Sequence, residues 1–175
     1  MTPAAKPARL FFALWPDERA RAALAHQAAA IQRVAGGRAT RAESIHVTLA
    51  FLGATDPARL EELTQAAGGV RMRPFGLVFD GAGYWKHNRI AWAGASAVPP
   101  ALDALVSELR SALGAARFPF DPKPFVPHVT LVRNARPGFA MPEVAPIAWG
   151  VSGFVLVESV TRPQGSEYAI AGRWP

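Results

Sequence analysis

The sequence predicts a mixed fold of helices and strands, built as two similar lobes that face each other across a cleft. Half of the 175 residues are hydrophobic and 18% are charged, so the chain can bury a sizeable core. A strand, a helix and a second strand follow one another twice, and that second strand carries His-Val-Thr-Leu both times, at 46–49 and at 128–131. The length is typical of one domain, so we expect residues 1–175 to form a single bilobal domain.

Periodicity and turn residues predict the elements of the first half of the chain. These are a strand over 9–15, a helix over 17–34, a strand over 45–52 and a helix from 56 to about 67. The first strand is a short apolar run rich in aromatic residues, and Pro16 suits the start of the helix that follows. Gly36-Gly37 is typical of the residues that end a helix, and Asp56-Pro57 is typical of a helix start.

The second half repeats this order with more turn residues. We expect strands over 75–79, 89–93 and 128–132, a turn at 81–83, a helix from 100 to Gly114, and late strands over 150–157 and 168–171. The apolar stripe of the helix consists of Leu102, Leu105, Val106, Leu109 and Leu113. Its spacing is that of a helix packed on one side.

The repeated motif predicts a site. The two copies are 82 residues apart, and a match of this kind arises by chance on the order of a few times in a thousand. Side chains alternate along a strand, so His46 and Thr48 point one way, as do His128 and Thr130. A twofold arrangement of the lobes would place two imidazoles and two hydroxyls around one central point.

These residue types favour acid–base chemistry on a phosphate. Imidazole titrates near pH 6.5, so one ring can take a proton from water while the other gives one to a leaving oxygen. The hydroxyls of Thr48 and Thr130 can donate to non-bridging phosphate oxygens, and Arg133 can add positive charge as the phosphorane develops. A cyclic phosphodiester suits this set best, because its strained ring opens without a metal.

Composition narrows the partners and excludes several classes of protein. Lys and Arg number 19 against 13 Asp and Glu, which favours an anionic partner such as RNA, although coding bias explains an arginine-rich composition equally well. The absence of Cys excludes disulfides, thiol nucleophiles and Cys-based metal sites, and we expect a cytoplasmic protein. The apolar run 10–15 is too short for a signal or membrane segment. No P-loop or His-Glu-x-x-His motif occurs, so we expect no cofactor, no metal and no membrane, and no obligate protein partner is evident.

Paired His-x-Thr motifs resemble the two-histidine phosphoesterase superfamily. The surrounding RLFFALWP, IHVTLAFLG, GYWKHNRIAWAG, KPFVPHVTLVR and YAIAGRWP more closely resemble the bacterial RNA 2′,3′-cyclic phosphodiesterase family, also called 2′-5′ RNA ligases. The resemblance implies a bilobal α+β fold, with antiparallel sheets lining a central cleft and helices outside. It also implies metal-independent hydrolysis of RNA or nucleotide 2′,3′-cyclic phosphates to 2′-phosphates. By the same analogy His46 is the general acid and His128 the base, but the likeness of the two motifs leaves the reverse assignment open.

Several alternatives stay open at this stage. The chain could instead be a non-catalytic nucleotide- or RNA-binding module. It could also join RNA ends through a 2′-5′ bond at the same site, with a 5′ hydroxyl in place of water. Among the aromatic residues, Phe125 has the best claim to a nucleotide contact, because it lies three residues before His128 in a proline-rich loop. The other aromatic candidates could also stack on a base, but core packing is the commoner use of such side chains; they are Trp15, Tyr84 and Trp85.

The remaining polar candidates receive weaker interpretations. Arg38 and Arg41 precede the first motif and suit either the RNA backbone or a solvated loop. Lys86 and His87 are expected in an exposed turn, and His26 on the surface of a helix.

Overall fold

The structure is a computed structural model that describes residues 7–175. Its helices are α1 (Glu18–Ala35), α2 (Leu60–Gly68) and α3 (Pro100–Ala115). Its strands are β1 (Ala8–Leu14), β2 (Arg38–Ala39), β3 (Val47–Thr55), β4 (Phe75–Phe79), β5 (Gly81–Trp85), β6 (Ile90–Gly94), β7 (His128–Arg133), β8 (Ile147–Val151), β9 (Phe154–Arg162) and β10 (Gly165–Trp174). Most predicted elements are therefore present with ends shifted by a few residues.

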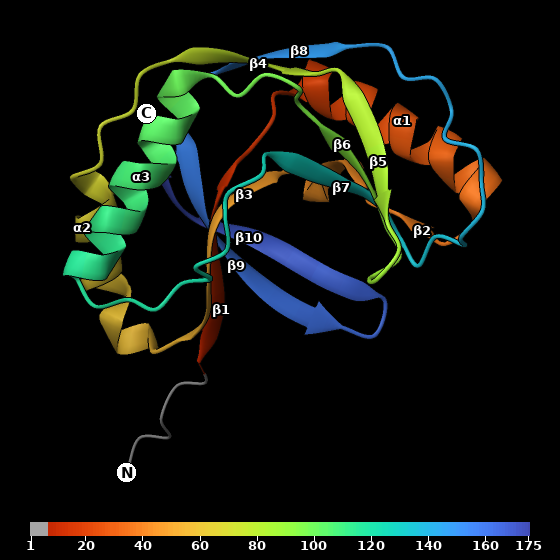
Figure 1. The fold of residues 1–175 in the computed structure, drawn as a ribbon. Helices are drawn as coiled ribbons and strands as arrows, with labels where there is room; N and C mark the ends of the chain where they lie inside the picture. Colours follow the sequence, from red (N-terminus) through yellow and green to blue (C-terminus); the bar gives the residue numbers. More distant parts are fainter. Residues whose placement is uncertain (1–6) are drawn as a thin grey trace.

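The strands form two antiparallel sheets and a short ribbon. The first sheet has the order β10-β9-β1-β3, and the second has the order β2-β7-β6-β5. Strands β4 and β8 pair as a separate two-stranded ribbon. In each four-stranded sheet the motif strand, β3 or β7, lies beside the strand that begins the repeated unit, β1 or β6. The predicted bilobal α+β architecture is confirmed (Figure 1).

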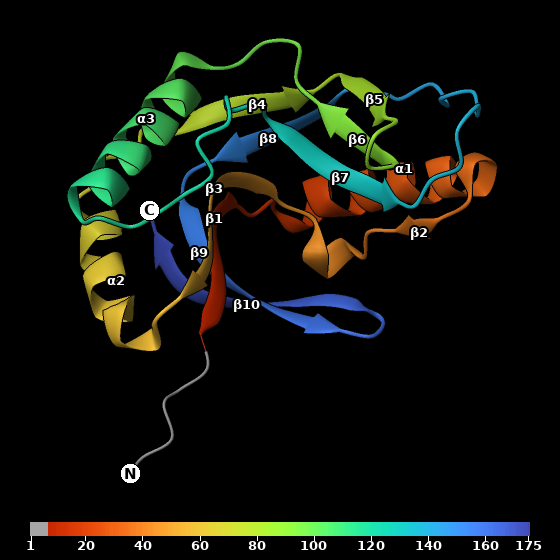
Figure 2. The same cartoon turned by 60° about the horizontal axis from the view of Figure 1, so that its bottom comes forward.

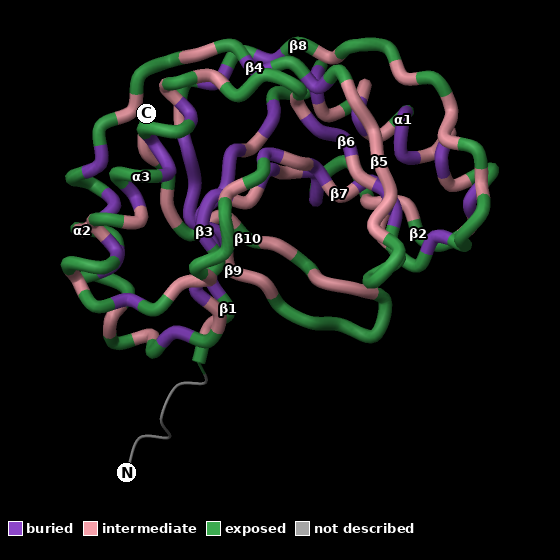
Figure 3. The backbone as a smooth tube through the Cα atoms, in the orientation of Figure 1, coloured by how far each residue is buried: buried purple, intermediate pink, exposed green. Residues whose placement is uncertain are grey.

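Helices α1 and α3 each cover the sheet to which the preceding strand does not belong, whereas α2 packs on the sheet of its own preceding strand. Helix α1 follows β1 of the first sheet, yet it packs against β7 and β2 of the second (Figures 1 and 2). Helix α3 follows β6 of the second sheet but contacts β3 of the first, beside α2, which reaches β10. Because the connections cross in this way, the two sheets share one continuous hydrophobic core that includes Leu14, Ile31, Leu109 and Leu131 (Figure 3).

Local capping explains the helix ends. The Asp17 carboxylate accepts from the Ala20 amide at 2.8 Å at the start of α1, and Gly36 ends that helix with a φ of 64°. Asp56 caps a 3₁₀ turn over Pro57–Arg59 that leads into α2, so the predicted single helix has a tighter first turn.

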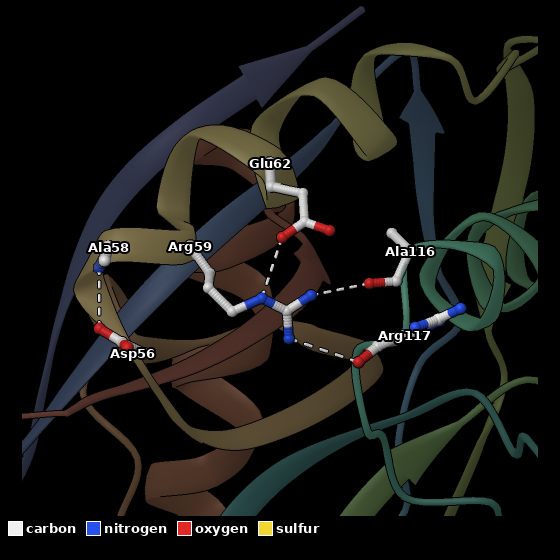
Figure 4. A network of polar contacts seen from close by, with 6 residues as sticks. All are labelled: Asp56, Ala58, Arg59, Glu62, Ala116 and Arg117. Carbon is white, nitrogen blue, oxygen red and sulfur yellow. Dashed lines mark hydrogen bonds and ion pairs between the residues drawn. The ribbon is translucent and has the colours of Figure 1, made fainter.

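Arg59 connects the start of α2 to the end of α3 (Figure 4). It pairs with Glu62 at 2.9 Å and donates to the carbonyl oxygens of Ala116 at 2.8 Å and Arg117 at 3.4 Å. Its guanidinium also lies 4.0 Å from the centre of the Phe118 ring. These bonds satisfy carbonyls beyond the last turn of α3, so we assign Arg59 a structural role.

The prediction of a turn at 81–83 was wrong, because these residues belong to β5. Gly83 lies opposite Trp92 of β6, and a Cβ on Gly83 would overlap the Trp92 ring. The glycine therefore makes room for an indole that crosses the strand pair, a role that local turn preference does not reveal.

The prediction of one strand over 150–157 was also wrong. The chain leaves the β4–β8 ribbon after Val151 and enters the first sheet at Phe154. At Gly153, which joins the two strands, a Cβ would lie 2.6 Å from the carbonyl oxygen of Trp174. The chain can change sheets here only because the two backbones come this close. The sequence stays largely apolar through the change, so it does not show where one strand ends and the next begins. The last strand, predicted over 168–171, is longer and covers the whole of β10.

Residues 7–175 include no helix with the length and apolar character needed to cross a bilayer.

Candidate active site

The two motif histidines occupy equivalent places at the starts of the motif strands. His128 is the first residue of β7, whereas His46 immediately precedes β3. The predicted strand over 45–52 therefore begins later than expected, because Ile45 closes a 3₁₀ turn over Ala42–Ser44. Strands β3 and β7 contact each other, so both motifs lie where the two sheets meet.

His46 is packed among aromatic side chains on the cleft face of the first sheet. Its ring stacks on Trp15, with centroids 5.6 Å apart and planes 9° apart. Phe11 lies 4.9 Å away and Tyr168 meets the ring edge-on at 5.2 Å. His46 Nδ1 lies 2.7 Å from the carbonyl oxygen of Ser44. A carbonyl only accepts, so Nδ1 carries the hydrogen and Nε2 of the neutral ring keeps its lone pair.

His128 has the same backbone arrangement in a more open setting. Its Nδ1 lies 2.8 Å from the carbonyl oxygen of Val126, again two residues earlier in the chain. Trp85 meets its ring edge-on, with centroids 4.7 Å apart. Both motifs thus hold the imidazole through Nδ1 and leave Nε2 for another partner.

Burial keeps both imidazoles neutral near pH 7. The pKa of His46 falls from 6.5 to about 4: burial is the main cause, the hydrogen bond to Ser44 opposes it, and the positive charges of Arg133 and His128 add to the lowering. Burial also lowers the pKa of His128, with a smaller contribution from Arg133, while the hydrogen bond to Val126 opposes the change.

A cavity of about 780 Å³, here the first cavity, brings together most of the predicted site residues. His46, Thr48, Thr130 and Arg133 all line it. Arg38 and Arg41, for which a solvated loop was an equal alternative, line it as well.

A second cavity of about 440 Å³ adjoins the first and holds the remaining predicted residues. His128, Phe125 and Trp85 line it, and Thr48 and Phe51 line both cavities. The two imidazoles therefore face adjoining cavities that meet at Thr48 and Phe51. Arg110, Lys123 and Asp121 add charge at the second cavity, where Lys123 pairs with Asp121 at 3.3 Å.

Phe51 belongs to the site and was missed from sequence. In the register of β1 with β3, Ala13 lies opposite Thr48 and Phe11 lies opposite Phe51, so Leu49 is an extra residue in β3. This β-bulge turns Phe51 to the same side as Thr48, where regular alternation would have placed Ala50. An exposed aromatic ring, 37% accessible, consequently stands between the two cavities.

The other candidates have mixed outcomes. Tyr84 donates to the carbonyl oxygen of Ala135 at 3.0 Å, a structural contact. His87 lies in an exposed turn, as expected, but also lines the second cavity. His26 is exposed on α1, as predicted. Within residues 7–175, no group of three or more His, Cys, Asp and Glu side chains is placed to hold a metal ion.

Comparison with known proteins assigns the family. The family model described as LigT like Phosphoesterase matches residues 14–92 and, separately, 94–168. RNA 2′,3′-cyclic phosphodiesterase of Escherichia coli (strain K12) is 32% identical over 170 residues, which cover 97% of each chain. The crystal structure of E. coli LigT in apo form has a TM-score of 0.87 at 31% identity, over 97% of this chain and 98% of that one. Its complex with 3′-AMP also has a TM-score of 0.87, at 32% identity over 96% and 97% of the two chains. With both halves matched by one model, the chain belongs to the LigT-like phosphoesterase family.

Proposed function

We propose that this protein hydrolyses 2′,3′-cyclic phosphates at RNA ends or on small nucleotides, and leaves 2′-phosphates. The observation that carries the proposal is the matched presentation of His46 and His128, each held through Nδ1 by a carbonyl two residues earlier. The name of the E. coli relative supports the same substrate class, and the 3′-AMP complex of E. coli LigT supports a nucleotide ligand.

The reaction requires two proton transfers, one for each imidazole. One ring takes a proton from water as the water oxygen attacks phosphorus, and the other gives a proton to O3′ as the P–O3′ bond breaks. The product is a 2′-phosphate with a free 3′ hydroxyl. Because both rings are neutral before substrate binds, the anionic phosphate has to favour the protonated form of the acid. No metal is required in this scheme.

The two rings differ in their fitness for the acid role. The family resemblance assigns His46 as acid and His128 as base. The reverse assignment has support from burial, because a proton on His46, whose pKa is about 4, is the less favourable of the two.

Three side chains are proposed to hold the reacting phosphate. Thr48 and Thr130 line the first cavity beside His46, where their hydroxyls can donate to non-bridging oxygens. The Arg133 guanidinium lies near enough to lower the pKa of both imidazoles, so it can also stabilise negative charge that develops between them.

The second cavity suits the terminal base. Phe125 and Trp85 line it, and aromatic side chains of this kind stack on nucleobases at about 1–3 kcal/mol per base. We therefore keep Phe125 as a proposed nucleotide contact.

Three broader expectations belong to the same proposal. Residues 1–175 are proposed to form one domain, supported by the core that both sheets share, although residues 1–6 lie outside the described part of the chain. A cytoplasmic location is proposed from the cysteine-free sequence. The same two proton transfers would permit 2′-5′ joining of RNA ends, with a 5′ hydroxyl in place of water attacking phosphorus as the P–O3′ bond breaks.

Phosphorus NMR tests the proposed reaction directly. Incubation of chelator-treated protein with a 2′,3′-cyclic nucleotide should replace the cyclic diester signal with that of a 2′-monoester, because the two imidazoles supply both proton transfers. A cyclic signal that persists while the nucleotide binds tightly would instead identify a non-catalytic binding module.

The pH dependence of kcat/KM should be bell-shaped, with its maximum below pH 6.5. The active form holds one proton on the pair of rings, and burial lowers both of their pKa values. Arg133→Gln should move the maximum to higher pH, because its charge lowers both values. Steady-state kinetics on a cyclic nucleotide measures this, and a flat profile or a maximum above neutral pH would contradict it.

A further inference from the structure

The first cavity holds more positive charge than one reacting phosphate needs. Five arginines line it: Arg9, Arg38, Arg41, Arg133 and Arg162. Two of them have carboxylate partners among the described residues, since Arg41 pairs with Glu43 at 3.3 Å and Arg162 with Glu167 at 3.1 Å. A cyclic phosphate carries one negative charge, which Arg133 already matches. The charges of Arg9 and Arg38 are therefore available for a further anionic group.

Arg38 lies across the cavity from the first sheet, to which it is connected by one hydrogen bond. It belongs to β2 of the second sheet, and its Nη1 donates to the carbonyl oxygen of Gln164 at 2.9 Å, in the hairpin between β9 and β10. This hairpin projects from the first sheet below β2 in both views (Figures 1 and 2). A guanidinium has five N–H donors, so most of those on Arg38 stay free for a ligand.

Arg9 combines charge with a stacking surface. It lies in β1 and is exposed, and its guanidinium carbon is 5.6 Å from the centre of the Phe51 ring. The ring stands where the two cavities meet. A cation beside an exposed aromatic ring matches the two parts of a nucleotide in a single strand, which are a phosphate and a base.

Uncharged donors extend this surface toward the hairpin. Hydroxyl side chains line the same cavity at Thr40, Ser159, Thr161 and Ser166. Such groups commonly donate to phosphate and sugar oxygens of nucleic acids.

We infer that Arg9 and Arg38 form a second phosphate subsite, which holds backbone phosphates of the RNA strand that carries the cyclic end. The inference rests on the proposed function and extends it to a substrate class. A cyclic-phosphate end on an RNA strand reaches both the reacting centre and this subsite, whereas a cyclic mononucleotide fills only the former. The protein therefore selects polynucleotide ends.

A double variant, Arg9→Gln with Arg38→Gln, tests the subsite. The measurement is the ratio of kcat/KM for a short single-stranded RNA with a 2′,3′-cyclic end to that for 2′,3′-cyclic AMP. The ratio should fall at least about tenfold, because two charge-assisted phosphate contacts are lost. The control is Arg19→Gln with Arg33→Gln, which removes the same charge from exposed positions on α1 outside both cavities. The control should leave the ratio unchanged.

Binding separates this inference from the proposed reaction. Fluorescence anisotropy with the same RNA ending in a 2′-phosphate requires no turnover. The slope of log K against log salt should be shallower by about 0.7 for each phosphate contact removed in the cavity variant. If the wild-type protein hydrolyses nothing but this specific loss persists, the subsite stands and the proposed function fails. An equal loss in the control variant, or an equal fall for both substrates, would overturn the subsite.

Discussion

His46→Ala and His128→Ala are each expected to lower the turnover of a 2′,3′-cyclic phosphate by about 10²- to 10⁴-fold, the usual contribution of general acid–base catalysis. Both rings line the adjoining cavities and keep Nε2 out of the backbone hydrogen bond, so the loss of either would remove one of the two proposed proton transfers. Single-turnover kinetics with saturating enzyme measures the chemical step without interference from product release.

Two further variants show whether a loss of turnover comes from the missing imidazole or from damage to the fold. His46 is packed against Trp15 and Tyr168, so alanine leaves a gap there, and His46→Gln provides a replacement of more similar volume. His26→Ala serves as the control, because His26 is exposed on α1 and lines neither cavity. Wild-type turnover in a folded His46 or His128 variant would refute the two-imidazole mechanism.

The same variants assign the acid. A substrate with sulfur in place of O3′ has a leaving group that departs without protonation. The variant that lacks the acid should therefore recover most of its lost rate on this substrate, while the variant that lacks the base should not.

The free energy of unfolding is expected to fall by about 3 kcal/mol between pH 7 and pH 4 through the titration of His46 alone. Burial lowers its pKa to about 4 in the folded protein, whereas the unfolded chain has the ordinary value of 6.5. Unfolding therefore takes up a proton between these values, at about 1.4 kcal/mol for each unit of difference. This contribution to stability is present above pH 6.5, falls as the pH drops toward 4 and is constant below that.

Urea titrations across this range measure the effect as a difference between proteins. In His46→Asn the amide can still donate to the Ser44 carbonyl, but the side chain does not titrate, so its stability should fall by about 3 kcal/mol less than that of the wild type. His26→Asn should follow the wild type, because His26 is exposed. Parallel curves for the wild type and His46→Asn would show that His46 is not buried as described.

The duplicated order of elements was predictable because each step had a local signal. The helix starts are set by caps at Asp17 and Asp56, which lie next to the helices they begin. The buried face of α3 is set by the apolar stripe within the helix itself. The paired motifs were visible for the same reason, since strand alternation alone places His128 and Thr130 on one side.

What was missed depends on contacts between distant segments. Phe51 reaches the site through a bulge set by the pairing of β3 with β1, and nothing in the sequence of β3 marks Leu49 as the extra residue. Gly83 resembles a turn residue until Trp92 is seen across it. Arg38 was a candidate that local sequence left undecided, and Arg9 was not a candidate at all. They are 29 positions apart in different sheets, and only the tertiary fold brings both to one cavity.

The crossed helices carry a consequence for how the imidazoles are held. A polypeptide severed in the loop after Gly94 would leave α1 in one fragment and β7, against which it packs, in the other. Neither fragment could bury its apolar surface alone, so each would have to recruit its complement. The two imidazoles proposed as catalytic are thus held on sheets that are tied together by α1 and α3, so we expect the two sheets to move as one body.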